Sequence, residues 1–260
     1  MAFPKIIHQI WIQGEAALPE KFKKNMDITI KKNPEYKYML WDEIKILELI
    51  QLKPEWVKKY YKFEYLHQKV DYAKLIILYM YGGIAIDMDA YTEQNLDKLF
   101  ETYADYDLVV SLFPDKGAII NYDICGKSTQ CLNNGNFFGK KKSDILCYMI
   151  DNLTTECSFY DHKIRCIHKT TGPQIFNEII DKYINNNNNN NNKSKIKLID
   201  NEYLEPCAVN PCAITENTYV VHKHENSWIP APVKYIKAHL AEFGILILLI
   251  VCILINMFCF

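Results

Sequence analysis

The sequence predicts an α/β fold with one hydrophobic core. Three observations support this prediction. Segments rich in β-branched and aromatic residues alternate with segments whose apolar residues recur at helical spacing, from the first residues onward. A chain of 260 residues with 49% hydrophobic content can bury one substantial core without a second domain. Residues 66–86 combine an amphipathic helix, a Gly-Gly stop and a short apolar strand, which is a unit of an α/β sheet.

The other elements follow from start and stop signals along the chain. Asn33-Pro34 closes the first helix, Asp42 is a good N-cap, and Pro54 suits a first helical turn. The eight consecutive asparagines within 185–194 cannot bury apolar surface, so we expect a disordered loop there. We expect strands at residues 5–12, 36–41, 84–86, 107–113, 133–139, 196–199 and 219–221, and helices at 19–32, 43–52, from 54 onward, and at 66–81, 143–152 and 171–183.

Charge and cysteine content narrow the class of protein. A net charge of −1 gives no electrostatic reason to propose nucleic acid as a partner. The nine cysteines are odd in number, irregularly spaced and form no Cys-x-x-Cys pair. This pattern favours free thiols in a reducing compartment over a disulfide framework or a zinc site.

The C-terminal residues 243–260 form an uninterrupted apolar stretch in which Asn256 is the one strongly polar side chain. As a helix it would be about 27 Å long, close to the roughly 30 Å of a bilayer's hydrocarbon core. We expect a single-pass membrane anchor here, with a buried terminal helix as the alternative. No signal peptide is expected, so the globular domain, residues 1–235, would lie on the cytosolic side of the membrane.

Asp87 and Asp89 stand where the short apolar strand 84–86 ends. Strand alternation would put both carboxylates on one face and Met88 on the other, in the core. Paired carboxylates suit a hard divalent cation such as Mn²⁺ or Mg²⁺. The motif alone is weak, because a second Asp-x-Asp at 105–107 lacks this context.

Six segments in order together resemble the family 32 glycosyltransferases, the group with a DXD sugar-binding region. They are KIIHQIW, PEYKYMLWDE, the helix-Gly-Gly-strand ending in DMD, NNGNFFGKK, TGPQIF and HENSW, and they span about residues 3–230. The chain is similar, more distantly, to the glucosyltransferase domains of large clostridial toxins. The resemblance implies a GT-A (Rossmann-like) fold, a divalent metal, usually Mn²⁺, a nucleotide-sugar donor, and transfer with retention of configuration.

The resemblance also implies roles for the acidic and basic residues. Asp87 and Asp89 would hold the metal and the donor's ribose and diphosphate, and Asp71 would hold hydroxyls of the donor sugar. Lys74 would act with Asp71 in donor binding and catalysis. It stands where the family usually has arginine, and lysine keeps the charge but loses the planar two-point fork. From the residues alone, the favoured interpretation is a surface ion pair between Asp71 and Lys74, three residues apart on one helix.

The other implied donor contacts are spread along the chain. Trp11 would lie near the nucleotide base, although a core aromatic is the alternative, and Asn134 would lie beside the donor sugar. His222, a further metal ligand, would act with Ser227 and Trp228 in a C-terminal loop that closes on the diphosphate. His8 is expected to be a structural histidine.

The function implied is transfer of a hexose from a nucleotide sugar to a hydroxyl on a lipid, glycan or protein. The predicted anchor and a similarity to inositol phosphoceramide mannosyltransferases favour a membrane glycolipid. Because the sequence names no second carboxylate as nucleophile, we expect attack on the same face as the departing diphosphate. One alternative is a membrane-tethered module that binds nucleotide sugar or glycan without transfer. The other alternative is a haloacid-dehalogenase-like phosphatase, because the segment IAIDMDAYT resembles the strand motif of that class. The class also needs a metal-binding acidic pair further along the chain, which this sequence lacks.

Overall fold

A computed structural model describes residues 3–113, 124–126, 130–159, 161–186, 194–207 and 212–225. Residues Met1–His224 form one compact unit, distinct from Glu225–Phe260. The predicted anchor at 243–260 and the predicted domain limit at 235 lie outside the described residues and stay predictions. Within the described ranges, no helix is both long and apolar enough to cross a membrane.

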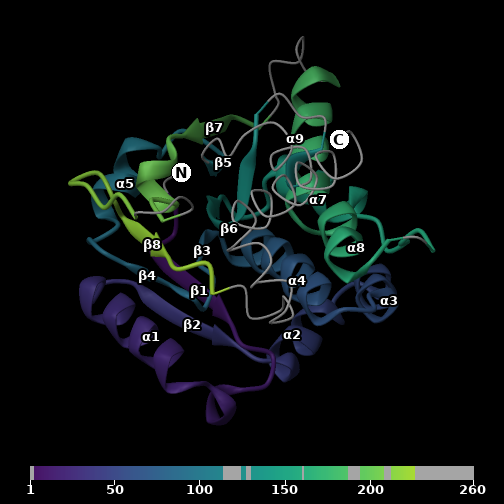
Figure 1. The fold of residues 1–260 in the computed structure, drawn as a ribbon, viewed down its shortest axis with the longest axis horizontal. Helices are drawn as coiled ribbons and strands as arrows, with labels where there is room; N and C mark the ends of the chain where they lie inside the picture. Colours follow the sequence, from purple (N-terminus) through teal and green to yellow (C-terminus); the bar gives the residue numbers. More distant parts are fainter. Residues whose placement is uncertain are drawn as a thin grey trace, which may run out of the picture. The chain divides into compact units, whose positions relative to one another are not determined.

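A mixed six-stranded sheet carries the fold, in the order β2-β1-β3-β6-β5-β7 (Figure 1). β1 pairs in parallel with β2 and β3, β6 runs antiparallel to β3 and β5, and β7 is parallel to β5. A separate two-stranded sheet joins β4 to β8 in antiparallel fashion. The strands are β1 (Ile6–Ile10), β2 (Lys37–Trp41), β3 (Gly83–Ala85), β4 (Ala90–Thr92), β5 (Leu108–Leu112), β6 (Leu132–Gly139), β7 (Ile196–Ile199) and β8 (Val220–His222).

Helices pack on the sheets, as the predicted α/β class requires. α4 contacts β1, β3 and β6 and packs against α7, which in turn packs against α9. α1 contacts β4, and α10 contacts β5 and β8. The helices are α1 (Glu20–Lys32), α2 (Glu43–Ile50), α3 (Pro54–Lys62), α4 (Leu66–Tyr81), α5 (Asp97–Thr102), α7 (Asp144–Asn152), α8 (Lys163–Thr170), α9 (Pro173–Asn186) and α10 (Asn201–Leu204), with a 3-10 turn at Glu15–Ala17.

Neighbouring residues of the central strands enter two separate hydrophobic cores. On β5, Leu108 and Val110 join the core with α4, α7 and α9, whereas Val109 joins the core with α5 and α10. On β6, Phe137 and Phe138 divide between the same two cores. Because strand side chains alternate in direction, this division shows that the sheet is covered on both faces.

The Gly-Gly pair ends α4 as the sequence predicts. Gly82 and Gly83 have φ values of 69° and 100°, which favour glycine. A Cβ on Gly83 would also collide with the backbone oxygen of Ile6 on the neighbouring strand. The pair thus lets the chain leave the helix and join the sheet beside β1 within one residue.

Several boundaries differ from the sequence prediction. β3 ends at Ala85, so the Asp-x-Asp carboxylates lie in a turn and not on a strand. The sequence places His222 at the start of a loop, but it ends strand β8. α8 was not predicted. The asparagine loop is also shorter than 185–194, because α9 runs to Asn186 and Ser194 is buried, its backbone N–H bonded to the Tyr183 hydroxyl.

The expectation of free thiols is wrong for six of the nine cysteines. Among the described residues, Cys147 forms no disulfide. The bonded partners are five to nine residues apart in sequence, so each bond closes a short segment of the chain. Spacing alone could not show this, because the loop conformation decides whether the two side chains meet. The disulfides are Cys125–Cys131, Cys157–Cys166 and Cys207–Cys212.

Candidate active site

The carboxyl ends of β1, β2 and β3 open onto one edge of the large sheet, because these strands are parallel. β6 is antiparallel to β3 and therefore begins at this edge. Its register pairs Ala85 with Phe137, which brings Asp87 level with Gly135. In α/β folds, ligands bind outside the carboxyl ends of the parallel strands. A ligand-binding site is therefore expected at this edge of the sheet.

Asp87 and Asp89 lie at this edge, in the turn that joins β3 to β4. The turn is closed by the backbone N–H of Ala90, which donates to the Asp87 carbonyl at 3.0 Å. The side-chain oxygen of Asn136 accepts a hydrogen bond from the Asp87 N–H at 3.1 Å. Met88 is buried between the two acids, as predicted. The turn, and not strand alternation, aims both carboxylates into the site.

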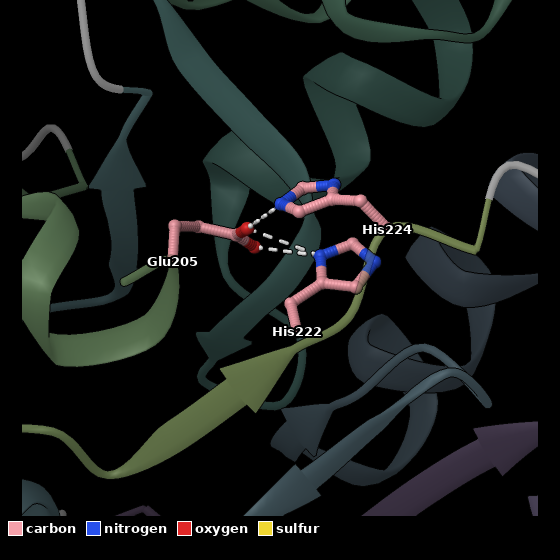
Figure 2. Close-up of side chains that lie close together, drawn as sticks. All are labelled: Glu205, His222 and His224. Carbon is pink, nitrogen blue, oxygen red and sulfur yellow. Dashed lines mark hydrogen bonds and ion pairs between the residues drawn. The ribbon is translucent and has the colours of Figure 1, made fainter. Parts of the chain in front are cut away.

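Strand β8 brings His222 against this turn, because the register of the small sheet pairs Ala90 with His222. The Nε2 atom of His222 lies 3.1 Å from Asp89 Oδ1 and 3.8 Å from Asp87 Oδ2. Its Nδ1 atom lies 3.1 Å from the carboxylate of Glu205, as Figure 2 shows. Burial opposes the charged form of His222, but Glu205 and Asp89 outweigh it and raise its pKa well above the usual value.

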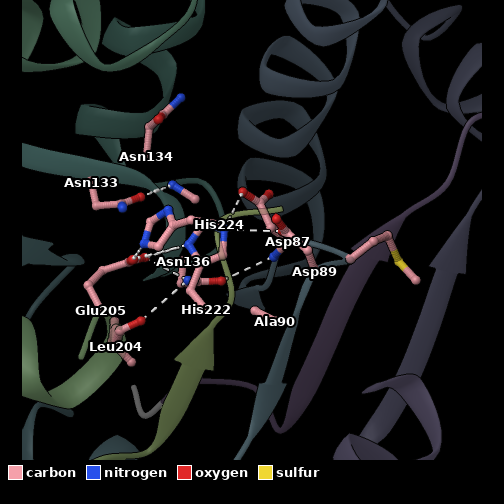
Figure 3. Close-up of polar contacts among 12 residues, drawn as sticks. Asp87, Asp89, Ala90, Asn133, Asn134, Asn136, Leu204, Glu205, His222 and His224 are labelled. Atoms are coloured by element: carbon pink, nitrogen blue, oxygen red, sulfur yellow. Dashed lines mark hydrogen bonds and ion pairs between the residues drawn. The ribbon is translucent and has the colours of Figure 1, made fainter. Parts of the chain in front are cut away.

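Asp87, Asp89 and His222 fit the divalent cation that the sequence predicts (Figure 3). Each offers one ligand atom, and these atoms lie within 4.8 Å of one another. Carboxylate oxygens with an imidazole nitrogen suit Mn²⁺. Space for an ion depends on Gly135, where an added Cβ would lie 2.8 Å from Asp87 Oδ2 and 2.9 Å from His222 Cε1.

Lys74 is buried beside Asp87, with 4% of its side chain exposed. Its Nζ donates to Asp87 Oδ1 at 2.7 Å and to the carbonyls of Asn134 and Gly135 at 3.0 and 3.1 Å. These acceptors occupy all three N–H groups of the ammonium. Burial opposes its charge, but Asp87 and Asp71 outweigh that effect and raise the pKa of Lys74. Lys74 thus ties β6 to the Asp-x-Asp turn and is not part of a surface ion pair.

Asp71 lies one helical turn before Lys74 on α4 and forms a polar wall with two distant segments. Its carboxylate accepts from Asn134 Nδ2 at 3.2 Å and from Thr171 Oγ1 at 3.0 Å. Burial raises the pKa of Asp71 to about 7, with Lys74 opposing and Asp87 adding to the effect. The structure therefore groups Asp71 and Asn134 near the carboxylates of the turn, as the resemblance implies.

Three residues of the site escaped the sequence prediction: Asn136, Glu205 and His224 (Figure 3). Glu205 has no exposed surface and accepts from Asn136 Nδ2 at 2.7 Å. Burial opposes ionisation, but His222 and His224 outweigh it and lower the pKa of Glu205 to about 2. Asn136 could have been found, since strand alternation puts it on the face of Asn134. Nothing in the sequence around Glu205 marks it.

The remaining residues predicted to contact the donor are Trp11, Ser227 and Trp228. Trp11 follows the last residue of β1 at the same edge of the sheet, where its indole N–H donates to the Ala17 carbonyl at 3.3 Å. Its ring packs edge-on against Phe22. Ser227 and Trp228 lie outside the described residues. The roles of all three stay predictions.

Comparison with known proteins agrees with this geometry. Residues 19–107 match the family model described as the glycosyltransferase sugar-binding region containing the DXD motif. An uncharacterized glycosyltransferase of Acanthamoeba polyphaga mimivirus is 28% identical, over 87% of this chain and 84% of the relative. Inositol phosphoceramide mannosyltransferase 3 of Schizosaccharomyces pombe is 36% identical, over 38% of this chain and 27% of the relative. The chain thus spans about a quarter of that fungal enzyme's length.

The fold is shared with a solved glycosyltransferase. The apo structure of mouse xyloside xylosyltransferase 1 superposes with a TM-score of 0.52, over 86% of this chain and 98% of that one, at 11% sequence identity. That similarity confirms the GT-A-like α/β fold. The family match over residues 19–107 and the similarity to the mimivirus glycosyltransferase, not the superposition, indicate that the chain is a glycosyltransferase. More narrowly, the chain carries the DXD sugar-binding region, so the predicted resemblance is confirmed.

Proposed function

We propose that this protein transfers a hexose from a nucleotide sugar to a hydroxyl acceptor, depends on a divalent cation, and retains the anomeric configuration. The observation that carries the proposal is the convergence of Asp87, Asp89 and His222 within 4.8 Å at the carboxyl edge of the sheet. A bound Mn²⁺ there would stabilise negative charge on a departing diphosphate as a Lewis acid. The neighbouring wall of Asp71 and Asn134 supplies acceptors and donors for sugar hydroxyls.

The chain's own residues would orient the donor for the reaction. Asp71 would accept hydrogen bonds from sugar hydroxyls, and Asn134 would donate to them, as the family resemblance implies. The bond from the anomeric carbon to the diphosphate oxygen breaks, and a bond to the acceptor oxygen forms on the same face. The acceptor's proton passes to the released diphosphate. Lys74 serves this step indirectly, because its three hydrogen bonds hold Asp87 and β6 in place.

The acceptor we propose is a membrane glycolipid of the phosphoinositol-ceramide type. The support is the name of the fungal relative, which is 36% identical over 38% of this chain. The predicted apolar stretch at 243–260 would keep the catalytic unit at the membrane surface.

The test is nucleoside diphosphate release and transfer from a panel of nucleotide sugars, with Mn²⁺ or EDTA, using the full chain in detergent. Turnover of one donor that requires Mn²⁺ and is lost in Asp89→Asn is expected. Asp105→Asn, in the second and exposed Asp-x-Asp, is the matched control and should keep full activity. Donor binding without turnover, equal with and without metal, would support the binding-module alternative instead. Trapping a glycosyl adduct on any carboxylate would refute same-face attack.

We also propose that the catalytic unit works in an oxidising compartment, not in the cytosol. Three disulfides in one domain are typical of secretory or extracellular environments and rare in reducing ones. Alkylation of the denatured protein without reductant should modify Cys147 and leave the six paired cysteines unmodified, by peptide mass spectrometry. Full modification of those six in protein isolated from its native host would restore the cytosolic prediction.

A further inference from the structure

Glu205 is a fully buried carboxylate in contact with three other polar side chains (Figure 2). Its oxygens lie 3.1 Å from His222 Nδ1, 3.0 Å from His224 Nε2 and 2.7 Å from Asn136 Nδ2. Removing an ionised carboxylate from water costs several kcal/mol unless it is paired and hydrogen-bonded. These three partners offset that cost, and their number suggests a task beyond filling space.

One contact leads through His222 to the proposed metal site. Glu205 occupies the Nδ1 side of the imidazole, so the opposite nitrogen, Nε2, faces Asp89 Oδ1 at 3.1 Å and Asp87 Oδ2 at 3.8 Å. A histidine can ligate a metal only through a nitrogen that carries no hydrogen. A carboxylate that accepts from Nδ1–H leaves Nε2 as the ligand atom.

The second contact leads through Asn136 to the backbone of the Asp-x-Asp turn. The Asn136 amide nitrogen donates to Glu205, while its oxygen accepts from the Asp87 N–H at 3.1 Å. The two bonds use opposite ends of the amide, so Glu205 also fixes which end faces Asp87. Figure 3 shows both routes converging on the turn.

We propose that Glu205 is the positioning residue of the metal site: it holds His222 by its ring and Asp87 by way of Asn136 before a cation arrives. This inference rests on the proposed function, since it requires that Asp87, Asp89 and His222 bind the cation. Carboxylates behind a metal-bound histidine orient the ring and raise its basicity, and their loss typically weakens metal binding about 10- to 100-fold.

Glu205, His222 and His224 could themselves be read as a second three-ligand cluster. A cation between them would have to displace the hydrogen on His222 Nδ1 and compete with the Asn136 amide for Glu205 Oε1. The geometry therefore favours hydrogen bonding at Glu205 and metal binding on the Nε2 side, and the protonation state of His222 Nδ1 distinguishes the two arrangements in the second measurement below.

The test compares Glu205→Gln with Glu202→Gln in the full chain. Glu202 lies three residues earlier on α10, is bonded to Thr215 and Asn217, and provides the same chemical change away from the site. Mn²⁺ affinity is measured from the electron paramagnetic resonance signal of free Mn²⁺, with and without UDP or GDP. Glu205→Gln should weaken Mn²⁺ binding about 10- to 100-fold, while Glu202→Gln stays within about twofold of wild type.

A second measurement needs no variant and decides the question if Glu205→Gln does not fold. Nitrogen NMR of the histidine-labelled wild type with Mg²⁺ should show His222 protonated at Nδ1 and unprotonated at Nε2. An unprotonated Nδ1, or wild-type Mn²⁺ affinity in a folded Glu205→Gln variant, would overturn the inference and leave the proposed function standing. Failure of the wild type to bind Mn²⁺ at all, even with a nucleoside diphosphate, would overturn both.

Discussion

Gly135 gives the sharpest prediction about the site, because a single methyl group there would occupy the space between two proposed ligands. A Cβ on Gly135 would lie 2.8 Å from Asp87 Oδ2, 2.8 Å from Asn133 Oδ1 and 2.9 Å from His222 Cε1. Its φ is not in the region that favours glycine, since the positive-φ glycines are Gly14, Gly82, Gly83 and Gly126. The effect of Gly135→Ala is therefore steric and local.

The size of the effect follows from these distances. Ordinary contact begins at 3.4 Å, so Asp87 Oδ2 must retreat by about 0.6 Å and the His222 ring by about 0.5 Å. Metal–ligand distances tolerate deviations of only about 0.2 Å. We expect Mn²⁺ binding to weaken at least about tenfold, or about 1.4 kcal/mol. The free energy of unfolding should fall by about 1–3 kcal/mol from overpacking.

The assay is Mn²⁺ titration together with urea unfolding, and Gly139→Ala is the matched control. Gly139 lies on the same strand, where an added Cβ would meet the end of the flexible Leu146 side chain at 2.9 Å. That variant should lose comparable stability but bind Mn²⁺ like the wild type. A folded Gly135→Ala protein with wild-type Mn²⁺ affinity would refute the placement of the cation between Asp87 and His222.

Two further predictions concern the buried histidine His8 and the acidic residue Asp71. His8 donates from Nε2 to the Gly82 carbonyl at 2.9 Å and accepts from the Trp41 indole at 3.1 Å, and burial lowers its pKa to about 4. Since the unfolded chain takes up that proton near pH 6.5, the stability from neutral His8 is complete above that pH. It is lost as the pH falls toward 4, by about 3 kcal/mol. Urea unfolding at several pH values should show a flatter dependence in His8→Gln, and an unchanged slope would contradict this account. Asp71→Asn should lower donor turnover about 10- to 100-fold, the value of a hydrogen bond to a charged group, with Mn²⁺ affinity within about twofold. Equal losses of turnover and Mn²⁺ affinity would instead show that Asp71 contributes to metal binding and not to donor binding.

Most elements were predictable because their signals lie within a few residues of each boundary. The Asp42 side chain caps α2 by accepting from the Lys45 N–H at 2.9 Å, as its position before an apolar run indicates. Glycines 82 and 83 end α4 for the reason given by their φ values. The structural role predicted for His8 is confirmed by its two hydrogen bonds. Helix α8 was missed because it is only eight residues long and most of its side chains are polar.

The site was predictable only in part, for a physical reason. Strand pairing depends on packing between segments far apart in the sequence, so the local preferences of each segment do not determine which strands pair. Lys74 illustrates the limit: it lies three residues after Asp71 on one helix, and that spacing alone favours a surface ion pair between the two. The fold instead carries its ammonium to Asp87 and two β6 carbonyls, because α4 packs across β3 and β6.

By itself, the sequence determined the α/β class, the order of most strands and helices, and the Asp-x-Asp motif with its glycosyltransferase resemblance. These features follow from periodicity, capping and ordered motifs, which are local in the chain. Only the tertiary structure decided which side chains complete the site. Pairing of β4 with β8 joins His222 to Asp89 across 133 residues, and Glu205 reaches both His222 and Asn136 from a short helix that no motif marks.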